Sequence, residues 1–206
     1  MAGSDTLSTY VLSSDIAAAD PNGVCTTQTP SGAGNLTING ALASGGEATL
    51  VPARNVTITS GGSSETGKNF TVTGTDVNGN AVSEQLAGPG SSATVSTTKI
   101  FKVVTQVYVD AATAGAVTVG SGTTISSTIY AGRARIRGLY FVNTANSGPL
   151  NFVNGNNGNT VMKIQTTGGA TSADYPDVPD EGLLCPDGAF VNFLATDVAS
   201  LTVFYN

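Results

Sequence analysis

The sequence predicts an all-β fold, with two small antiparallel β-sandwich or barrel-like units preceded by an extended N-terminal arm. The 206 residues include 26 glycines but only 11% charged residues. That composition favours strands and turns, because Thr and Val suit a pleated surface while Gly and Asn supply the backbone angles of tight turns. Hydrophobic residues make up 40% of the chain and recur in short blocks bounded by turn residues. We find no helical periodicity of useful length.

Residues 1–34 are predicted to form the extended arm. Pro and Gly occur too densely in residues 20–34 for a long regular element. The arm also carries apolar residues that a free tail would expose to water: Tyr10, Val11, Leu12 and Ile16. A free tail and docking onto a neighbouring subunit are the two alternatives. Docking predicts that removal of residues 1–30 weakens assembly.

Residues 35–121 are predicted to form the first β unit. Short apolar segments follow one another at the spacing typical of a sandwich or barrel, and turn signals such as Gly45-Gly46 and Asn78-Gly79 separate them. Loops this short permit antiparallel but not parallel pairing. The expected strands are Leu36–Ile38, Ala48–Val51, Asn55–Thr59, Phe70–Thr75, Ala81–Leu86, Thr94–Val95, Phe101–Val109 and Ala116–Val119.

Residues 122–206 are predicted to form a second, related unit. The block Phe70–Val72, Asn78-Gly79 and Val82 is echoed by Leu150–Phe152, Asn157-Gly158 and Val161. Both blocks predict a strand, an Asn-Gly turn of type I′ and a returning strand. Chance similarity between two glycine-rich β sequences is the alternative to a true repeat.

Charge and residue inventory exclude several functions. A net charge of −6 and a pI near 4.3 argue against direct nucleic-acid binding, and no apolar stretch reaches the length of a membrane helix. The chain has no histidine, which excludes Ser-His-Asp and Cys-His catalysis and His-ligated zinc. Cys25 and Cys185 are expected to be free thiols, with one long-range disulfide as the alternative. We therefore expect no enzyme activity and no cofactor.

Three motifs resemble ligand sites but fit loops better. Residues 62–69 approach a phosphate-binding loop, yet Asn69 replaces the required hydroxyl and a strand follows where a helix should begin. Residues 76–84 have the acids of a calcium loop at the wrong spacing. Residues 174–187 contain five acids and could hold a hard cation, although a proline-stiffened surface loop is favoured.

The segment 133–137 gives the sharpest local signal. Arg133, Arg135 and Arg137 would share one face of a strand, while Ala134 and Ile136 point to the core. Like charges side by side cost energy unless acceptors or acids meet them. The partner is either the acidic loop 174–181 of the same chain or an acidic surface on another subunit.

The segments ARNVTITSGG (53–62), FTVTGTDVNGNAVSE (70–84) and KIFKVV (99–104) together resemble virion structural proteins of tailed bacteriophages, of the capsid decoration or cement type. The resemblance implies binding to the major capsid protein on the outer surface of the virion, commonly as a homo-trimer that holds capsid subunits together. The arm residues and the three arginines would then contact capsid or sister subunits. A tail, neck or fibre component and a carbohydrate-binding module are the alternatives.

Overall fold

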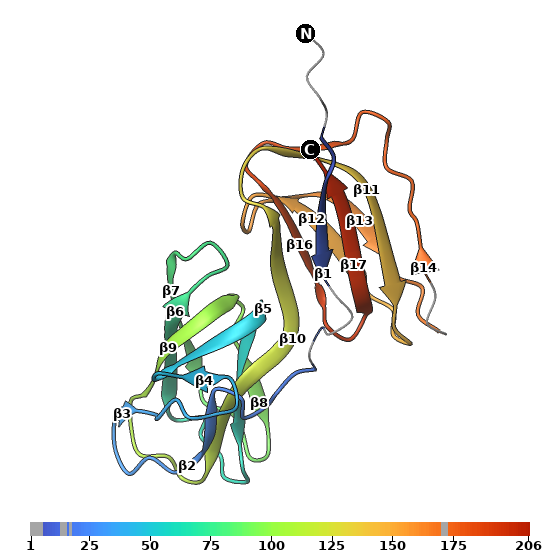
Figure 1. Ribbon diagram of the computed structural model, residues 1–206. Helices are drawn as coiled ribbons and strands as arrows, with labels where there is room; N and C mark the ends of the chain where they lie inside the picture. Colours follow the sequence, from blue (N-terminus) through green and yellow to red (C-terminus); the bar gives the residue numbers. More distant parts are fainter. Residues whose placement is uncertain (1–5, 13–15, 17, 170–172) are drawn as a thin grey trace. The chain divides into compact units, whose positions relative to one another are not determined.

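The computed structural model describes residues 6–12, 16, 18–169 and 173–206, and these residues form β-strands and loops without a helix (Figure 1). The strand pairs whose register is described are antiparallel. The predicted all-β, antiparallel fold is therefore confirmed. The chain divides into two compact units, which we call the N-terminal unit (19–124) and the C-terminal unit (1–18 with 125–206). No helix able to cross a membrane occurs in the described ranges.

The N-terminal unit is built on a sheet in the order β10-β5-β9-β6-β7, to which four short strands are added. Apolar side chains at alternate positions fill its core; in β6, for example, Phe70 and Val72 are fully buried. The strands are β2 (Cys25–Gln28), β3 (Gly34–Asn35), β4 (Ala43–Ser44), β5 (Glu47–Ser60), β6 (Asn69–Thr75), β7 (Ala81–Ala87), β8 (Thr94–Ser96), β9 (Phe101–Val109) and the first part of β10 (Val117–Tyr130).

Two separate strands were predicted at 48–51 and 55–59, but the structure has one continuous strand there, β5. It runs without interruption through Pro52, and its pairing with β9 shifts register between Thr49 and Arg54. Proline cannot donate to a ladder, and sheets accommodate it at such irregularities. The predicted strand 36–38 is instead a loop beside β3.

Both predicted hairpins are present, as β6–β7 and β12–β13. Neither has the predicted type I′ turn, which requires positive φ at two successive residues. In the first hairpin only Gly79 has positive φ (84°), because the Asp76 carboxylate accepts hydrogen bonds from the amides of Asn78 and Asn80 and shapes a longer loop. In the second, the positive values belong to Gly155 and Asn157, which are not adjacent.

The C-terminal unit is a sandwich of two sheets. One has the order β1-β17-β11-β14, with β15 also paired to β11; the other contributes β13-β12-β16 and the end of β10. Their facing side chains, including Ile136, Phe141 and Leu201, form a second core. The strands are β1 (Ser8–Leu12), β11 (Ala134–Asn143), β12 (Pro149–Asn154), β13 (Asn159–Gln165), β14 (Ala173–Asp174), β15 (Leu183–Cys185), β16 (Ala189–Leu194) and β17 (Val198–Tyr205).

Residues 6–12, 16 and 18–34, the part of the predicted arm that the structure describes, do not form a separate arm. Residues 8–12 are strand β1, which pairs with β17 of the same chain. Residues 19–34 belong to the N-terminal unit, where Val24 and Cys25 are fully buried in the core. The chain is divided again between residues 124 and 125, whereas the sequence suggested a boundary after residue 121. The predicted arm is divided between the two units because Tyr10, Leu12 and Ile16 pack against the core of the C-terminal unit, whereas Val24 and Cys25 lie in the core of the N-terminal unit.

Candidate functional site

The three arginines lie where the alternation rule placed them. Arg133 immediately precedes β11, and Arg135 and Arg137 are the second and fourth residues of that strand. Ala134 and Ile136 between them are 2% and 0% exposed. The predicted split, with apolar side chains in the core and arginines on the opposite face, is confirmed.

The loop before β15 meets two of these arginines. Arg135 Nη1 donates to the carbonyl of Glu181 at 2.8 Å, and Arg137 Nη1 donates to the carbonyl of Asp180 at 3.1 Å. Arg137 Nε also donates to Asn206 Oδ1 at 3.0 Å. The acidic loop is thus a partner of these arginines within the chain, through the backbone carbonyls of Asp180 and Glu181. Carbonyl acceptors hold a guanidinium group in place without neutralising its charge.

Gly182 allows this close approach. Its φ of +71° is in the left-handed region, and a Cβ there would lie 2.8 Å from the carbonyl oxygen of Ile136 and 3.0 Å from Arg137 Cδ. An L-residue at 182 would therefore be strained and would push the loop away from β11. No sequence pattern indicated that this particular glycine positions the arginines.

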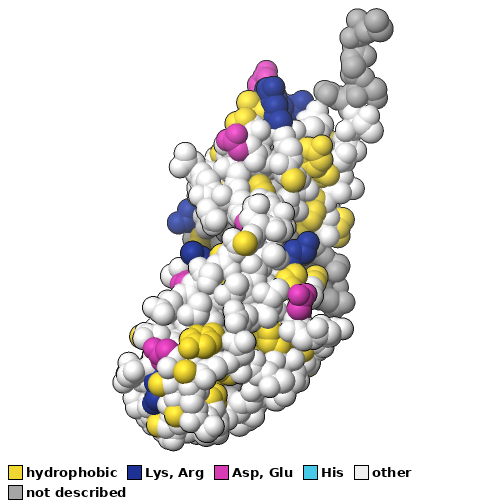
Figure 2. Space-filling view, turned by 90° about the vertical axis from the view of Figure 1, so that its left-hand side faces the viewer, with side chains coloured by type: hydrophobic (Ala, Val, Ile, Leu, Met, Phe, Trp, Pro, Cys, Tyr) yellow, Lys and Arg dark blue, Asp and Glu magenta, His cyan; other side chains and the backbone are white. Residues whose placement is uncertain are grey.

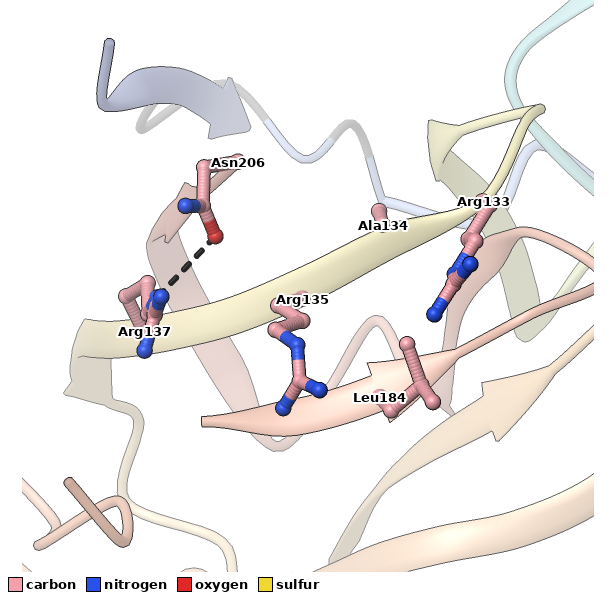
Figure 3. A pocket seen from close by; sticks show the side chains of 6 residues that line it. All are labelled: Arg133, Ala134, Arg135, Arg137, Leu184 and Asn206. Carbon is pink, nitrogen blue, oxygen red and sulfur yellow. Dashed lines mark hydrogen bonds between the residues drawn. The ribbon is translucent and has the colours of Figure 1, made fainter. Parts of the chain in front are cut away.

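The arginines line an open cavity of about 250 Å³ (Figure 3). Figure 3 shows Arg133 and Arg135 extending from the same side of β11 toward Leu184 of the neighbouring strand β15, with Arg137 linked to Asn206. Within the part of the chain that the structure describes, no carboxylate lies at ion-pair distance from Arg133 or Arg135. The full lining is Arg133, Ala134, Arg135, Arg137, Leu184 and Asn206. We call this the arginine pocket.

The arginine pocket belongs to the outer face of the β1-β17-β11 sheet, the face turned away from the core. Register places Val11 opposite Thr202, and Thr202 opposite Tyr140, on this face. Val11 is 62% exposed. Tyr140 packs against Tyr175 with ring centroids 4.8 Å apart, and Tyr175 is 74% exposed. The outer face therefore combines exposed apolar and aromatic groups with concentrated positive charge.

The other predicted arm residues face inward. Tyr10, Leu12 and Ile16 pack against the core of the C-terminal unit. The hydroxyl groups of Tyr10 and Ser127 hydrogen bond to each other, and burial raises the pKa of Tyr10 despite this bond. Of the four arm residues predicted to contact capsid or sister subunits, the structure leaves only Val11 available on the surface.

Two acidic side chains at the ends of segment 174–187, Asp174 and Asp187, bind different asparagines. Asp174 Oδ2 accepts a hydrogen bond from Asn143 Nδ2 at 2.6 Å, and Asp187 Oδ2 accepts one from Asn154 Nδ2 at 2.8 Å. Among the described residues, no three acidic or cysteine side chains are grouped as metal ligands would be. Segment 174–187 is thereby hydrogen-bonded to β11, through Asn143, and to β12, through Asn154.

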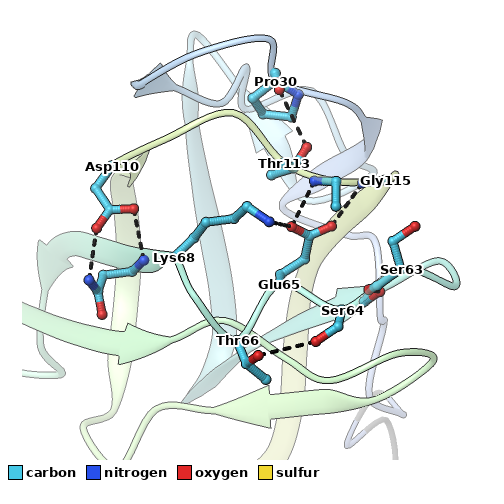
Figure 4. A network of polar contacts seen from close by, with 12 residues as sticks. Pro30, Ser63, Ser64, Glu65, Thr66, Lys68, Asp110, Thr113 and Gly115 are labelled. Atoms are coloured by element: carbon cyan, nitrogen blue, oxygen red, sulfur yellow. Dashed lines mark hydrogen bonds and ion pairs between the residues drawn. The ribbon is translucent and has the colours of Figure 1, made fainter.

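A buried carboxylate that the sequence did not single out connects distant parts of the N-terminal unit (Figure 4). Glu65 is fully buried and lies 2.6 Å from Lys68 Nζ, and it accepts hydrogen bonds of 2.9 Å from the amides of Ala114 and Gly115. Burial raises the pKa of Glu65, but the bonds from Lys68 and the two amides outweigh burial and hold the pKa below its ordinary value of 4.5. The phosphate-loop-like segment 62–69 thus folds as a structural loop.

Both cysteines are free, as the sequence suggested, and the structure shows that both are buried. Burial raises the pKa of Cys25 to about 12 and also raises that of Cys185. Neither thiol is activated for nucleophilic chemistry, because the reactive form is the thiolate.

Comparison of the chain with protein-family models, curated proteins and solved structures gave no significant match. The outer face of the C-terminal unit and the sequence resemblance are the two observations that bear on function.

Proposed function

We propose that this chain is a virion structural protein that decorates and stabilises the outer surface of a bacteriophage icosahedral capsid by bridging neighbouring capsid subunits. The observation that carries the proposal is the outer face of the C-terminal unit, where exposed Val11 and Tyr175 accompany the arginine pocket. A protein that binds an assembly needs such a mixed apolar and charged surface. The resemblance of residues 53–104 to decoration proteins supplies the kind of assembly.

Charged residues are sparse in this chain, at 11%, and the positive ones are partly concentrated. Figure 2 shows one face of the molecule, on which few charged side chains are scattered among mostly uncharged ones. Three of the eight cationic residues of the chain lie within residues 133–137. A bound decoration protein stabilises a shell by mass action, as any ligand of an assembled state does. From the resemblance we also propose that the chain acts as a homo-trimer, which light scattering would detect as three times 20.5 kDa.

Removal of the first 30 residues is a poor test of this function, because it would delete Val24 and Cys25 from the core of the N-terminal unit. The structure offers a cleaner variant. Val11→Glu places a charge on the exposed outer face, whereas Val51→Glu places one at another exposed valine, 72% accessible, in the N-terminal unit.

The test measures copies bound per particle after purified heads of the phage that carries the protein are mixed with each variant and sedimented. We expect saturating binding of the wild type and of Val51→Glu, and reduced occupancy of Val11→Glu. Absence of wild-type binding to heads would refute the proposal. Few copies, located at a neck or tail, would instead favour a tail or neck component.

A carbohydrate-binding role is the second candidate, favoured by the Tyr140–Tyr175 pair, of which Tyr175 is exposed, since aromatic faces stack on sugars. A glycan array probed with the wild type and Tyr175→Ala decides it. Signals that disappear in the variant would support sugar binding, and an array without signals would dismiss it.

A further inference from the structure

The arginine pocket has unused hydrogen-bonding capacity. A guanidinium group has five N–H donors. In the described residues the side chain of Arg133 makes no hydrogen bond or ion pair, and the side chain of Arg135 makes one hydrogen bond, to the carbonyl of Glu181. Two positive charges near each other therefore present free donors to the same cavity, in a chain of net charge −6. Such an arrangement is unfavourable without an anion and favourable with one.

We propose that the arginine pocket binds a side-chain carboxylate from an acidic polypeptide segment of a partner protein. A carboxylate has two coplanar oxygens that match the guanidinium fork. The cavity of about 250 Å³ is of the size of one side chain with part of its backbone. This inference rests on the proposed function, because it names the chemistry of the capsid surface that the outer face would meet.

The lining favours a polypeptide over a sulfated or phosphorylated ligand. Leu184, 37% exposed, provides an apolar wall beside the arginines, which suits the aliphatic part of a peptide. None of the six lining residues is aromatic, so no ring is present for a sugar to stack on. The backbone amides of Arg135 and Asn206 already donate to each other's carbonyl groups, at 2.7 and 3.0 Å, and are not available to a phosphate group.

Arg135 and Arg137 are held in place before a ligand arrives. The carbonyls of Glu181 and Asp180 and the Asn206 side chain fix their guanidinium groups. Fixed donors lose little conformational entropy when they bind, which favours recognition of one carboxylate geometry. Arg133 has no such support, so its role is to close the pocket on the ligand.

The test uses the isolated full chain and a hexaglutamate peptide, with hexaglutamine as the neutral control, in isothermal titration calorimetry at low ionic strength. We expect hexaglutamate to bind, hexaglutamine not to bind, and the affinity to fall as salt screens the charges. The double variant Arg133→Ser/Arg135→Ser should lose about tenfold in affinity, which corresponds to about 1.4 kcal/mol.

The matched control is Lys102→Ser/Lys163→Ser, which removes two exposed positive charges outside the pocket. Compared at an ionic strength of about 0.15 M, where the Debye length is about 8 Å, it should bind hexaglutamate within about twofold of the wild type, because charges outside the pocket are then screened. If Arg135→Ser disturbs folding, the single variant Arg133→Ser decides, since Arg133 bonds to nothing in the described residues. Equal losses in both double variants would overturn the proposal.

Two further measurements distinguish a carboxylate ligand from other anions. Tighter binding of a heparin oligosaccharide than of hexaglutamate, or displacement of the peptide by sulfate at equal concentration, would overturn the inference in favour of a sulfate or phosphate site. Normal attachment to heads without peptide binding would refute this inference alone. Peptide binding by a chain that does not attach to heads would refute the proposed function alone.

Discussion

Glu65→Gln tests the buried polar network of the N-terminal unit. The substitution keeps the shape of the side chain but removes the charge that faces Lys68 and the amides of Ala114 and Gly115. Its new NH₂ group also meets a donor instead of an acceptor. The three charge-assisted hydrogen bonds are worth about 1.5–3 kcal/mol each, and we expect the equivalent of two of them to be lost with the charge.

The expected loss in the free energy of unfolding is about 3 kcal/mol, near the lower end of that sum, because Lys68 is 17% exposed and regains hydration. For a unit of this size, the melting temperature should fall by about 10 °C or more. Differential scanning calorimetry measures this. The control is Glu47→Gln, which makes the same chemical change at an exposed position in β5. Equal melting temperatures for the two variants would refute the reasoning.

The same network predicts a pH dependence. The folded pKa of Glu65 is lower than 4.5, so its stabilising contribution is complete above that value and is lost as pH falls through the folded pKa. The stability difference between wild type and Glu65→Gln should therefore shrink in acid below pH 4.5. A difference that stays constant as the pH is lowered well below that value would contradict the assigned bonds.

The remaining predictions concern the C-terminal unit and the cysteines. Leu12→Ala should lower the free energy of unfolding by about 1–2 kcal/mol, because Leu12 packs partly on the core. Val11→Ser, on the exposed side of β1, should change it by less than about 0.5 kcal/mol. Urea unfolding distinguishes the two variants, and equal losses would contradict the β1–β17 register. Gly182→Ala should lower the melting temperature and weaken hexaglutamate binding together, since a Cβ there meets Ile136 and Arg137; unchanged binding would mean that the loop does not position the arginines. Both thiols should resist a thiol reagent in the native protein and react once it is unfolded, because Cys25 and Cys185 are buried; rapid native labelling would contradict their burial.

Local patterns predicted much of the fold. Strand positions such as 70–75, 81–86 and 101–109 agree closely with β6, β7 and β9, because alternation and turn residues are local properties. The inward and outward sides of residues 133–137 also followed from alternation alone. The turn type at Asn78-Gly79 was wrong, since Asp76 and its two backbone hydrogen bonds override the dipeptide preference.

Long-range pairing could not be predicted from the sequence. Nothing near Tyr10 indicates that β1 pairs with β17, almost 200 residues away, and a free tail or a docked arm was the natural expectation. The role of Glu65 depends on amides at positions 114 and 115, which only the tertiary fold brings to it. The acidic loop was one of two predicted partners of the arginines, but the use of its carbonyls at 180 and 181 depends on the conformation of Gly182.

Electron microscopy of purified heads prepared with and without this protein tests the central claim most directly. We predict additional density in many copies on the outer capsid surface, with the β1-β17-β11 face of the C-terminal unit turned toward the capsid. Heads that look the same in both preparations, or density confined to a neck or tail, would contradict the proposed function.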